Sequence, residues 1–172
     1  MKDVVLRPME PEDLGLLYQI ELERSDWAVS SSGIPYSRYA LKQYLSAQPE
    51  DIFQSSELRL TIQNLDTGDP VGVADLYAYD PISRKAEVGI AVLKKEQGRG
   101  YATRALAELE KIARMKLRMH QLYAYVKCSN ERSLRLFQSA GFCLTATLFD
   151  WLYDEGRFHD VCLLQKKIEK KP

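Results

Sequence analysis

The chain has 172 residues and a formal net charge of zero, with 45% hydrophobic and 28% charged residues. This length suits a single domain over residues 1–172, whose core holds without disulfides or metals. The balanced charge and the lack of a long basic stripe argue against nucleic acid as a partner. No apolar segment reaches the length of a membrane span, and the N-terminus lacks a signal-peptide core, so we expect no membrane partner either.

The three cysteines are odd in number, widely spaced and free of any Cys-x-x-Cys pattern. They therefore predict neither a disulfide framework nor a zinc site, and we expect no bound metal. A reducing, cytoplasmic location fits them best. These residues are Cys128, Cys143 and Cys162.

The N-terminal third reads as a short strand followed by two helices. Residues 4–7 form the strand, and the acidic segment after Pro8 begins a helix that ends before Ser25. A break at residues 30–35 precedes a second amphipathic helix over residues 37–47. This acidic, tyrosine-rich region suits a lid or a pocket wall, and plain packing explains it equally well.

The middle of the chain predicts a three-stranded meander. Apolar residues alternate over residues 58–62, and a turn at residues 66–69 leads into an apolar run over residues 71–79. A second turn at residues 80–83 leads to a third strand over residues 86–93.

The C-terminal half predicts strand, helix, strand and helix, then a hairpin. A helix over residues 103–118 connects the third meander strand to a strand over residues 122–127, so these two strands are parallel neighbours. Asn130 is placed to cap the next helix, residues 131–140. The final hairpin covers residues 144–164. The whole predicts one mixed α/β domain.

A glycine turn joins the third meander strand to the helix that follows it, with the sequence Gln97-Gly98-Arg99-Gly100-Tyr101-Ala102. Its glycines allow a tight turn that points backbone N–H groups outward at a helix start, where anions bind. A phosphate cradle and a plain connection both fit these residues. The turn is no dinucleotide fingerprint, because Thr103 replaces the third glycine, and no Gly-Lys-Ser/Thr of a P-loop follows.

The turn and its flanking helices carry the excess positive charge of the chain. Residues 94–135 hold 11 basic and 4 acidic side chains. A solvated helix face explains much of this excess, but a polyanionic ligand at the turn would also be attracted.

Three segments together resemble the GNAT superfamily of N-acetyltransferases: residues 86–92, residues 97–102 and residues 130–142. Their order and spacing agree with that family. The opening residues 6–14 and the closing residues 155–160 look like the branch that holds spermidine acetyltransferases and ribosomal-protein N-terminal acetyltransferases. The resemblance covers almost the whole chain.

The resemblance implies an α/β fold with a central, twisted, mostly antiparallel sheet of about seven strands and about four flanking helices. It implies acetyl-CoA as the cosubstrate, with pantetheine lying between the splayed strands of Ile90 and Tyr125. Backbone groups of Ile90, Ala91 and Val92 would hold this arm, and the Val92 N–H would polarise the thioester carbonyl. The amides of residues 98–103 would cradle the pyrophosphate.

Asn130 and Ser133 would contact pantetheine from the following helix, although a cap and an ordinary helix residue explain them equally well. The residues expected to bind the coenzyme are thus Ile90, Ala91, Val92, Gln97, Gly98, Arg99, Gly100, Tyr101, Ala102, Thr103, Asn130, Ser133 and Phe137.

The chemistry requires a group that removes a proton from the acceptor amine. Glu87, on the strand beside the expected thioester site, is the candidate base, acting through a water; the alternative is a structural partner for a nearby Arg or Lys. The family usually supplies a tyrosine as general acid where this chain has Phe137, which also suits the core. The possible substitutes are water, Tyr101, Tyr125, Cys128 and Ser133.

The sequence therefore predicts direct, sequential acetyl transfer to a primary amine. A polyamine such as spermidine is the first choice because acidic side chains outside the coenzyme helices could steer a polycation. A protein N-terminus or an aminoglycoside is the enzymatic alternative, and a non-catalytic acyl-CoA sensor or an interaction scaffold is the alternative of another class. Exposed strand edges in the C-terminal hairpin could form a homo-oligomer. The steering residues are Glu12, Glu21, Glu23, Asp26, Glu50 and Asp51.

Overall fold

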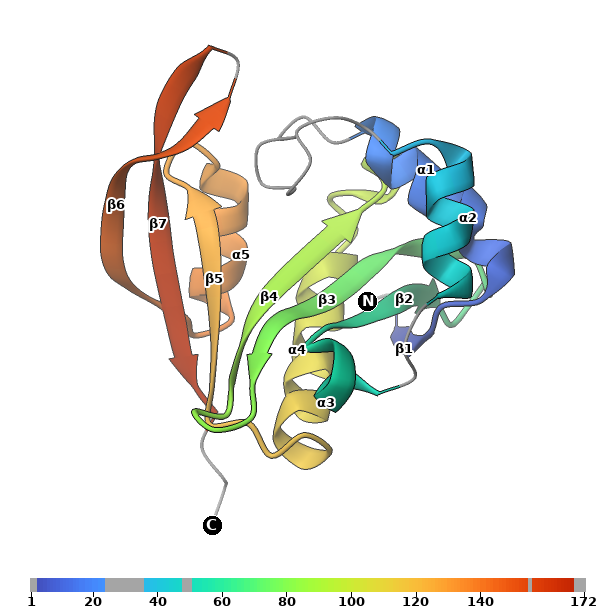
Figure 1. Cartoon of the computed structure of the whole chain (residues 1–172), viewed down its shortest axis with the longest axis horizontal. Coiled ribbons are helices and arrows are strands. Elements are labelled where there is room, and N and C mark those ends of the chain that lie inside the picture. Colours follow the sequence, from blue (N-terminus) through green and yellow to red (C-terminus); the bar gives the residue numbers. More distant parts are fainter. Residues whose placement is uncertain (1–2, 24–35, 48–50, 155, 169–172) are drawn as a thin grey trace.

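The computed structural model describes residues 3–23, 36–47, 51–154 and 156–168. These residues form one seven-stranded sheet in the order β1-β2-β3-β4-β5-β7-β6, with helices on both faces (Figure 1). The strands are β1 (Val4–Pro8), β2 (Leu58–Asn64), β3 (Pro70–Asp80), β4 (Lys85–Val92), β5 (Gln121–Lys127), β6 (Cys143–Asp154) and β7 (Arg157–Lys167). The helices are α1 (Leu14–Glu23), α2 (Arg38–Ser46), α3 (Ile52–Ser55), α4 (Tyr101–Met115) and α5 (Glu131–Ser139), with short 3-10 turns η1 (Pro11–Asp13) and η3 (Lys94–Glu96).

Every strand pair is antiparallel except β4 and β5, which run parallel, so the predicted sheet is confirmed. The parallel pairing covers only residues 85–87 of β4 and residues 121–123 of β5. Beyond it, β4 continues against β3 alone and β5 continues against β7 alone. Figure 1 shows the two strands close together at the end nearest the C-terminus and separating toward the opposite end.

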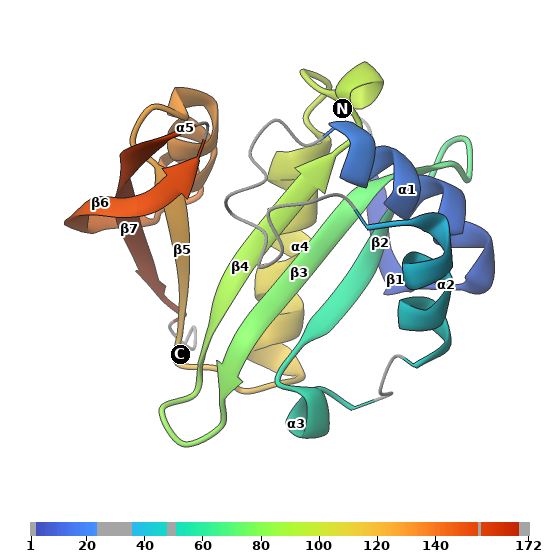
Figure 2. The same cartoon turned by 45° about the horizontal axis from the view of Figure 1, so that its top comes forward.

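The main hydrophobic core lies between the sheet and helices α4 and α5. Leu106, Leu109 and Ala113 recur at helical spacing on α4 and are fully buried, together with Leu76 of β3. The opposite face of the sheet is covered by α1 and α2, whose Leu17 and other apolar residues pack against β3 and β4 (Figure 2). The two faces therefore have separate apolar clusters.

Two helices differ from what the sequence predicted. Helix α4 begins at Tyr101 and ends at Met115, before the predicted end at residue 118. Its end is set by Arg118, whose φ of 51° is left-handed, and by the Met119 N–H, which bonds the Ala113 carbonyl at 2.9 Å. Helix α3 was not predicted, because a single turn is too short to show a 3.6-residue period. The predicted break at residues 30–35 lies outside the described residues.

The close approach of β3 to β4 near Val92 requires Gly72. A Cβ at this position would lie 2.3 Å from the carbonyl oxygen of Ala91 and 3.0 Å from the Cα of Val92. Since both contacts are backbone, the strands would have to separate.

We expect the Gly72→Ala variant to lose about 1–3 kcal/mol in free energy of unfolding, because the added methyl overpacks this contact. Urea unfolding followed by circular dichroism measures the loss. The matched control is Gly15→Ala in α1, where nothing lies within 4 Å of the new Cβ and helix propensity should raise stability slightly. Equal stability of the two variants would contradict the expectation.

Candidate active site

A cleft of about 900 Å³ opens where β4 and β5 separate. This volume lies within the range of small-molecule binding sites. One wall is formed by the end of β4, the glycine turn and the start of α4, and the other by the end of β5 and α5. Most of the predicted coenzyme residues line it: Ile90, Ala91, Val92, Gln97, Gly98, Gly100, Tyr101, Ala102, Thr103, Asn130 and Ser133.

The backbone of β4 presents hydrogen-bonding groups to this cleft. The Leu93 N–H bonds the Val71 carbonyl of β3 at 3.0 Å, so it points away from the cleft. Because N–H groups alternate in direction along a strand, those of Val92 and Ile90 point toward the cleft and that of Ala91 points toward β3. Gln97 Nε2 donates to the Val92 carbonyl at 2.9 Å, which leaves the Val92 N–H as the group offered to a ligand.

The glycine turn presents a second set of N–H groups. Gly98 and Gly100 have left-handed φ values of 76° and 83°, which strongly favour glycine. Gly100 is the N-cap of α4 and provides no side-chain cap, and the first turn contains no acidic residue. The Arg104 N–H bonds the Gly100 carbonyl at 3.2 Å, so the N–H groups of residues 101–103 precede the helical hydrogen-bond ladder. Such a helix start binds phosphate oxygens.

Helix α5 borders the cleft with polar and basic side chains. The Asn130 side-chain oxygen accepts the Ser133 N–H at 3.0 Å, so Asn130 does cap this helix while also lining the cleft. Arg132 Nη1 donates to Gln97 Oε1 and so joins α5 to the glycine turn across the cleft. Arg135 lines the same wall, three residues further along the helix.

Sequence reasoning missed Arg132 and Arg135 as site residues. The signal available was their i, i+3 spacing on a helix beginning at Asn130, within the basic segment of the chain. Their contact with the cleft depends on how α5 packs against β5, which no local pattern reveals. Lys94 and Lys127 also line the cleft, and the Lys127 ammonium is paired with Asp154 of the terminal hairpin at 2.5 Å.

Two predicted coenzyme residues lie away from the cleft. Phe137 is only 4% exposed and packs edge-to-face against Phe142, with ring centroids 5.1 Å apart. It therefore belongs to the core under α5. Arg99 pairs with Glu96 at 3.0 Å and lines a second, smaller cavity of about 370 Å³ beside α1.

Glu87 lies on the face of β4 opposite α4, because its neighbours Ala86 and Val88 point into the main core. It is half-buried, and burial raises the pKa of its carboxyl above the usual value. Five positions separate it from Val92, or roughly 17 Å along an extended strand. A proton from an amine held near the Val92 N–H would have to reach Glu87 through water.

The proposed substitutes for a tyrosine acid differ in their access. The side chain of Tyr101 is buried in the main core and 1% exposed. Burial and the neighbouring Cys162 thiol raise the pKa of Cys128 to about 11. Tyr125 is half-buried and packs edge-to-face against Tyr123. Of these four residues, Tyr101 and Ser133 line the cleft.

The acidic residues expected to steer a polycation are dispersed. Glu23 lines the cleft, where its carboxylate accepts the Lys94 N–H at 2.7 Å. Glu21 is buried, and Asp51 caps α3 by accepting the Phe53 N–H. Glu12 is exposed on η1. Asp26 and Glu50 lie outside the described residues.

The described ranges contain neither a metal-binding cluster nor a membrane-spanning helix. No group of three His, Cys, Asp or Glu side chains there is arranged to hold a metal ion. None of the helices in that part of the chain combines the length and apolar composition that a membrane crossing requires.

The profile of the family described as "Acetyltransferase (GNAT) domain" matches residues 3–143. The chain belongs to the GNAT acetyltransferase family. It is an acetyl-CoA-dependent N-acetyltransferase, and the residues of the cleft fit this cosubstrate. The N–H groups at the start of α4, which precede the helical hydrogen-bond ladder, suit the pyrophosphate, and the exposed edge of β4 suits an extended pantetheine arm.

Similar proteins include polyamine and ribosomal-protein enzymes. Spermidine N(1)-acetyltransferase of Escherichia coli (strain K12) is 26% identical over 165 residues, covering 94% of this chain and 86% of that protein. Bacillus subtilis (strain 168) YdaF, provisionally named a ribosomal N-acetyltransferase, is 30% identical over 94 residues, covering 55% and 51%. The Vibrio cholerae spermidine N-acetyltransferase structure in complex with CoA and spermine has a TM-score of 0.84 and 23% identity, covering 96% and 95% of the two chains.

We expect Arg132→Ala to weaken acetyl-CoA binding by roughly 10- to 100-fold, since charge-assisted hydrogen bonds contribute about 1.5–3 kcal/mol each. Isothermal titration calorimetry measures the dissociation constant, and the difference from the unmodified chain should shrink at high salt. Arg114→Ala on α4, away from the cleft-lining residues, is the matched control. Unchanged affinity in Arg132→Ala would contradict a role in binding.

Proposed function

We propose that this acetyltransferase acts on a primary amine of a polyamine such as spermidine. The observation that carries the transfer itself is the cleft between β4 and β5, which combines the outward Val92 N–H with the N–H groups at the start of α4. Support for a polyamine comes from the similarity to spermidine N(1)-acetyltransferase, which covers 94% of this chain and 86% of that protein, and from the Glu23 carboxylate at the cleft. The free cysteines support a cytoplasmic location.

Backbone N–H groups and one arginine bind the coenzyme in this proposal. The N–H groups of residues 98–103 and the Arg132 guanidinium hold the pyrophosphate, and Ile90 with Val92 holds the pantetheine arm. The Val92 N–H donates to the thioester oxygen, where negative charge develops during transfer. No cysteine is among the cleft-lining residues that the structure describes, which supports direct transfer without an acylated enzyme.

Glu87 is the base in this proposal. An amine with a pKa near 10 is unprotonated in roughly one molecule per thousand at pH 7, a cost of about 4 kcal/mol. Glu87 accepts this proton through a chain of waters, because five positions of β4 separate it from Val92. The leaving thiolate needs less help, because a thiol with a pKa near 8.5 leaves readily, and Ser133 or water can protonate it.

A protein N-terminus is the second candidate acceptor, favoured by the similarity to YdaF. An aminoglycoside is the third, and a non-catalytic acyl-CoA sensor or an interaction scaffold is the alternative of another class. These candidates are separated by thiol release from acetyl-CoA across polyamines, N-terminal peptides and aminoglycosides. The sensor requires tight binding without turnover, and the scaffold requires neither.

We expect turnover with spermidine and a fall in kcat of about 10²-fold or more in Glu87→Gln, because the proton acceptor is lost. Below the raised pKa of Glu87 its carboxyl is protonated and cannot act as a base, so kcat/KM should fall as pH decreases. The midpoint of this fall should lie above the usual pKa range of a glutamate. Glu108→Gln on the exposed face of α4 is the control. Phe137→Tyr should bring no gain, because that ring lies in the core.

Turnover confined to peptides would move the assignment to an N-terminal acetyltransferase. Tight acetyl-CoA binding without turnover on any amine would replace the enzyme with a sensor. Full activity in Glu87→Gln would remove Glu87 from the mechanism and leave the acceptor assignment standing.

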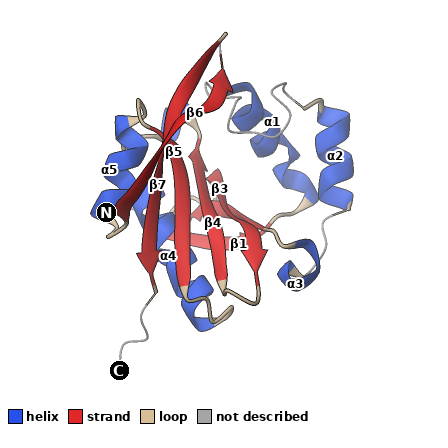
Figure 3. Cartoon of the chain, turned by 60° about the vertical axis from the view of Figure 1, so that its left-hand side comes forward, coloured by secondary structure: helices blue, strands red, loops and turns tan. Residues whose placement is uncertain are grey.

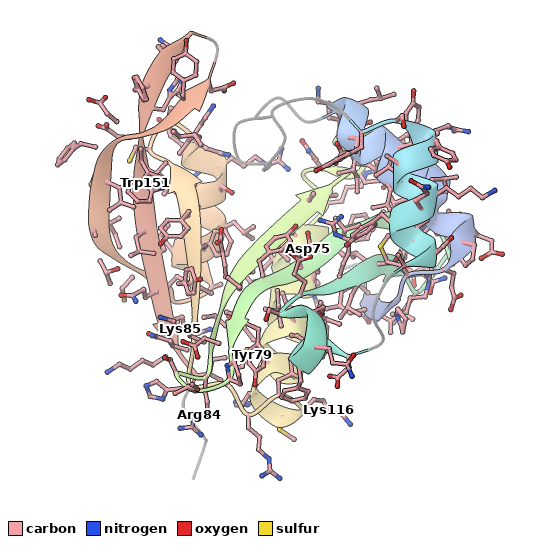
Figure 4. The ribbon with its side chains drawn as sticks, in the orientation of Figure 1. Asp75, Tyr79, Arg84, Lys85, Lys116 and Trp151 are labelled. Atoms are coloured by element: carbon pink, nitrogen blue, oxygen red, sulfur yellow. The ribbon has the colours of Figure 1, made fainter. Side chains whose placement is uncertain are left out.

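We also propose that β6 mediates homo-oligomerisation. This strand lies at the edge of the sheet and carries exposed aromatic side chains, of which Phe149 is 77% and Trp151 60% exposed. Tyr153 of β6 and Phe158 of β7 add an aromatic pair with ring centroids 5.1 Å apart. Strands β6 and β7 extend beyond the rest of the sheet (Figures 3 and 4). An edge strand with exposed apolar side chains favours association with another chain, which would cover them.

Sedimentation equilibrium tests this assembly. We expect the unmodified chain to sediment as a multiple of its 19.7 kDa mass and Trp151→Glu to dissociate, because the charge would be buried in the interface. Ile82→Glu, at a 93% exposed residue in the turn between β3 and β4, is the control. A monomeric unmodified chain would refute the proposal.

A further inference from the structure

A buried polar network lies on the face of the sheet that also carries Glu87. Asp75 of β3 faces Arg59 of β2 in register, and its side chain is 5% exposed. Arg59 Nε donates to Asp75 Oδ1 at 2.7 Å, and Arg59 Nη2 donates to the Tyr77 hydroxyl at 2.7 Å. The Tyr77 hydroxyl in turn donates to Asp75 Oδ2.

Each member of this network fixes the others. The Arg59 guanidinium lies between the rings of Tyr44 and Tyr77, 5.4 and 5.9 Å from their centroids. Burial, followed by the nearby Asp75 charge, raises the pKa of Tyr77, so its hydroxyl stays protonated. The Tyr77 hydroxyl donates a hydrogen bond to Asp75 and accepts one from Arg59. These two bonds hold the aromatic ring in one orientation.

The Tyr77 ring lies across the neighbouring strand at Gly89. A Cβ at Gly89 would be 2.8 Å from Tyr77 Cε2, so a side chain there would displace the ring. Gly89 is paired with Asp75, and Tyr77 is paired with Glu87, so the side chains of Tyr77 and Glu87 leave the sheet next to each other on one face. On the other side, Glu87 is paired with Tyr123 of β5.

We propose that Arg59, Asp75 and Tyr77 form a positioning network for Glu87, in which the anchored Tyr77 ring covers one side of the Glu87 carboxyl and leaves water access only from the other side. Arg59 compensates the charge of Asp75, so Asp75 is assigned to the network and not to the acceptor amine. The network therefore acts through Glu87. This inference rests on the proposed role of Glu87 as the base.

The surroundings of Glu87 support this assignment. Burial raises the pKa of its carboxyl, and Tyr77 and Tyr123 occupy the paired positions on either side of it. Charged groups on the same face lie further along the strands or are already paired. The titratable and charged groups of this face near Glu87 are Tyr77, Tyr123, Tyr125, Asp80, Lys85 and the Arg59–Asp75 pair.

The test is direct titration of Glu87 by NMR in the full chain carrying ¹³C-labelled glutamate. The Glu87 signal is the one that disappears in Glu87→Gln. In Tyr77→Ala, water reaches the carboxyl from both sides, so its pKa should fall by about one unit, and the acidic limb of kcat/KM should move to lower pH by the same amount. Tyr77→Phe keeps the ring but loses its anchor, so a smaller shift in the same direction is expected.

The matched control is Tyr79→Phe, which removes a hydroxyl from the same strand on the side of the main core. It should leave the Glu87 titration unchanged. An unchanged Glu87 pKa in folded Tyr77→Ala would overturn the network's role, and if that variant does not fold, an unchanged pKa in Tyr77→Phe would do so.

The two proposals fail separately. A shifted Glu87 titration with full activity in Glu87→Gln would support the network and refute the base. Loss of activity in Glu87→Gln with an unshifted titration in the Tyr77 variants would support the base and refute the network.

Discussion

The short parallel pairing of β4 and β5 is the constraint on which the rest of this structure depends. After residues 85–87 and residues 121–123, the two strands diverge, and each keeps only its antiparallel neighbour. Backbone groups on the inner edges then require partners other than a strand. Gln97 supplies one for the Val92 carbonyl, and an extended ligand can supply one for the Val92 N–H. The cleft is thus a gap in the sheet, formed because β4 and β5 pair over only three residues each.

The helices that follow these strands complete the site. Each diverging strand leads through a short connection into a helix, α4 after β4 and α5 after β5, so both helix starts border the opening. Their N–H groups and the basic side chains of α5 concentrate positive charge where a pyrophosphate would lie. The Arg132–Gln97 hydrogen bond joins the two walls of the cleft. Gln97 also binds the Val92 carbonyl, so this one pair links a basic side chain of α5 to the backbone of β4.

The two faces of the sheet differ in polarity and in the functional groups they carry. The face under α4 and α5 is apolar and contains Phe137, which explains why this position cannot supply an acid to the cleft. The opposite face carries Glu87 and the buried Arg59–Asp75–Tyr77 network. A charged pair in that position is costly to bury unless it is hydrogen-bonded, and here Asp75 accepts hydrogen bonds from both Arg59 and Tyr77. Burial without a compensating charge is what raises the pKa of Glu87.

The sequence by itself determined the strands, the main helices and the glycine turn, because alternation, helical periodicity and positive-φ glycines are local properties of the chain. It also located most of the cleft residues through their resemblance to GNAT motifs. It could not determine that Phe137 points into the core, that Arg132 reaches Gln97, or that Tyr77 lies across Gly89. Those facts depend on strand register and on how helices rotate against the sheet. Only the tertiary structure decides them, because the residues that meet are far apart in the chain.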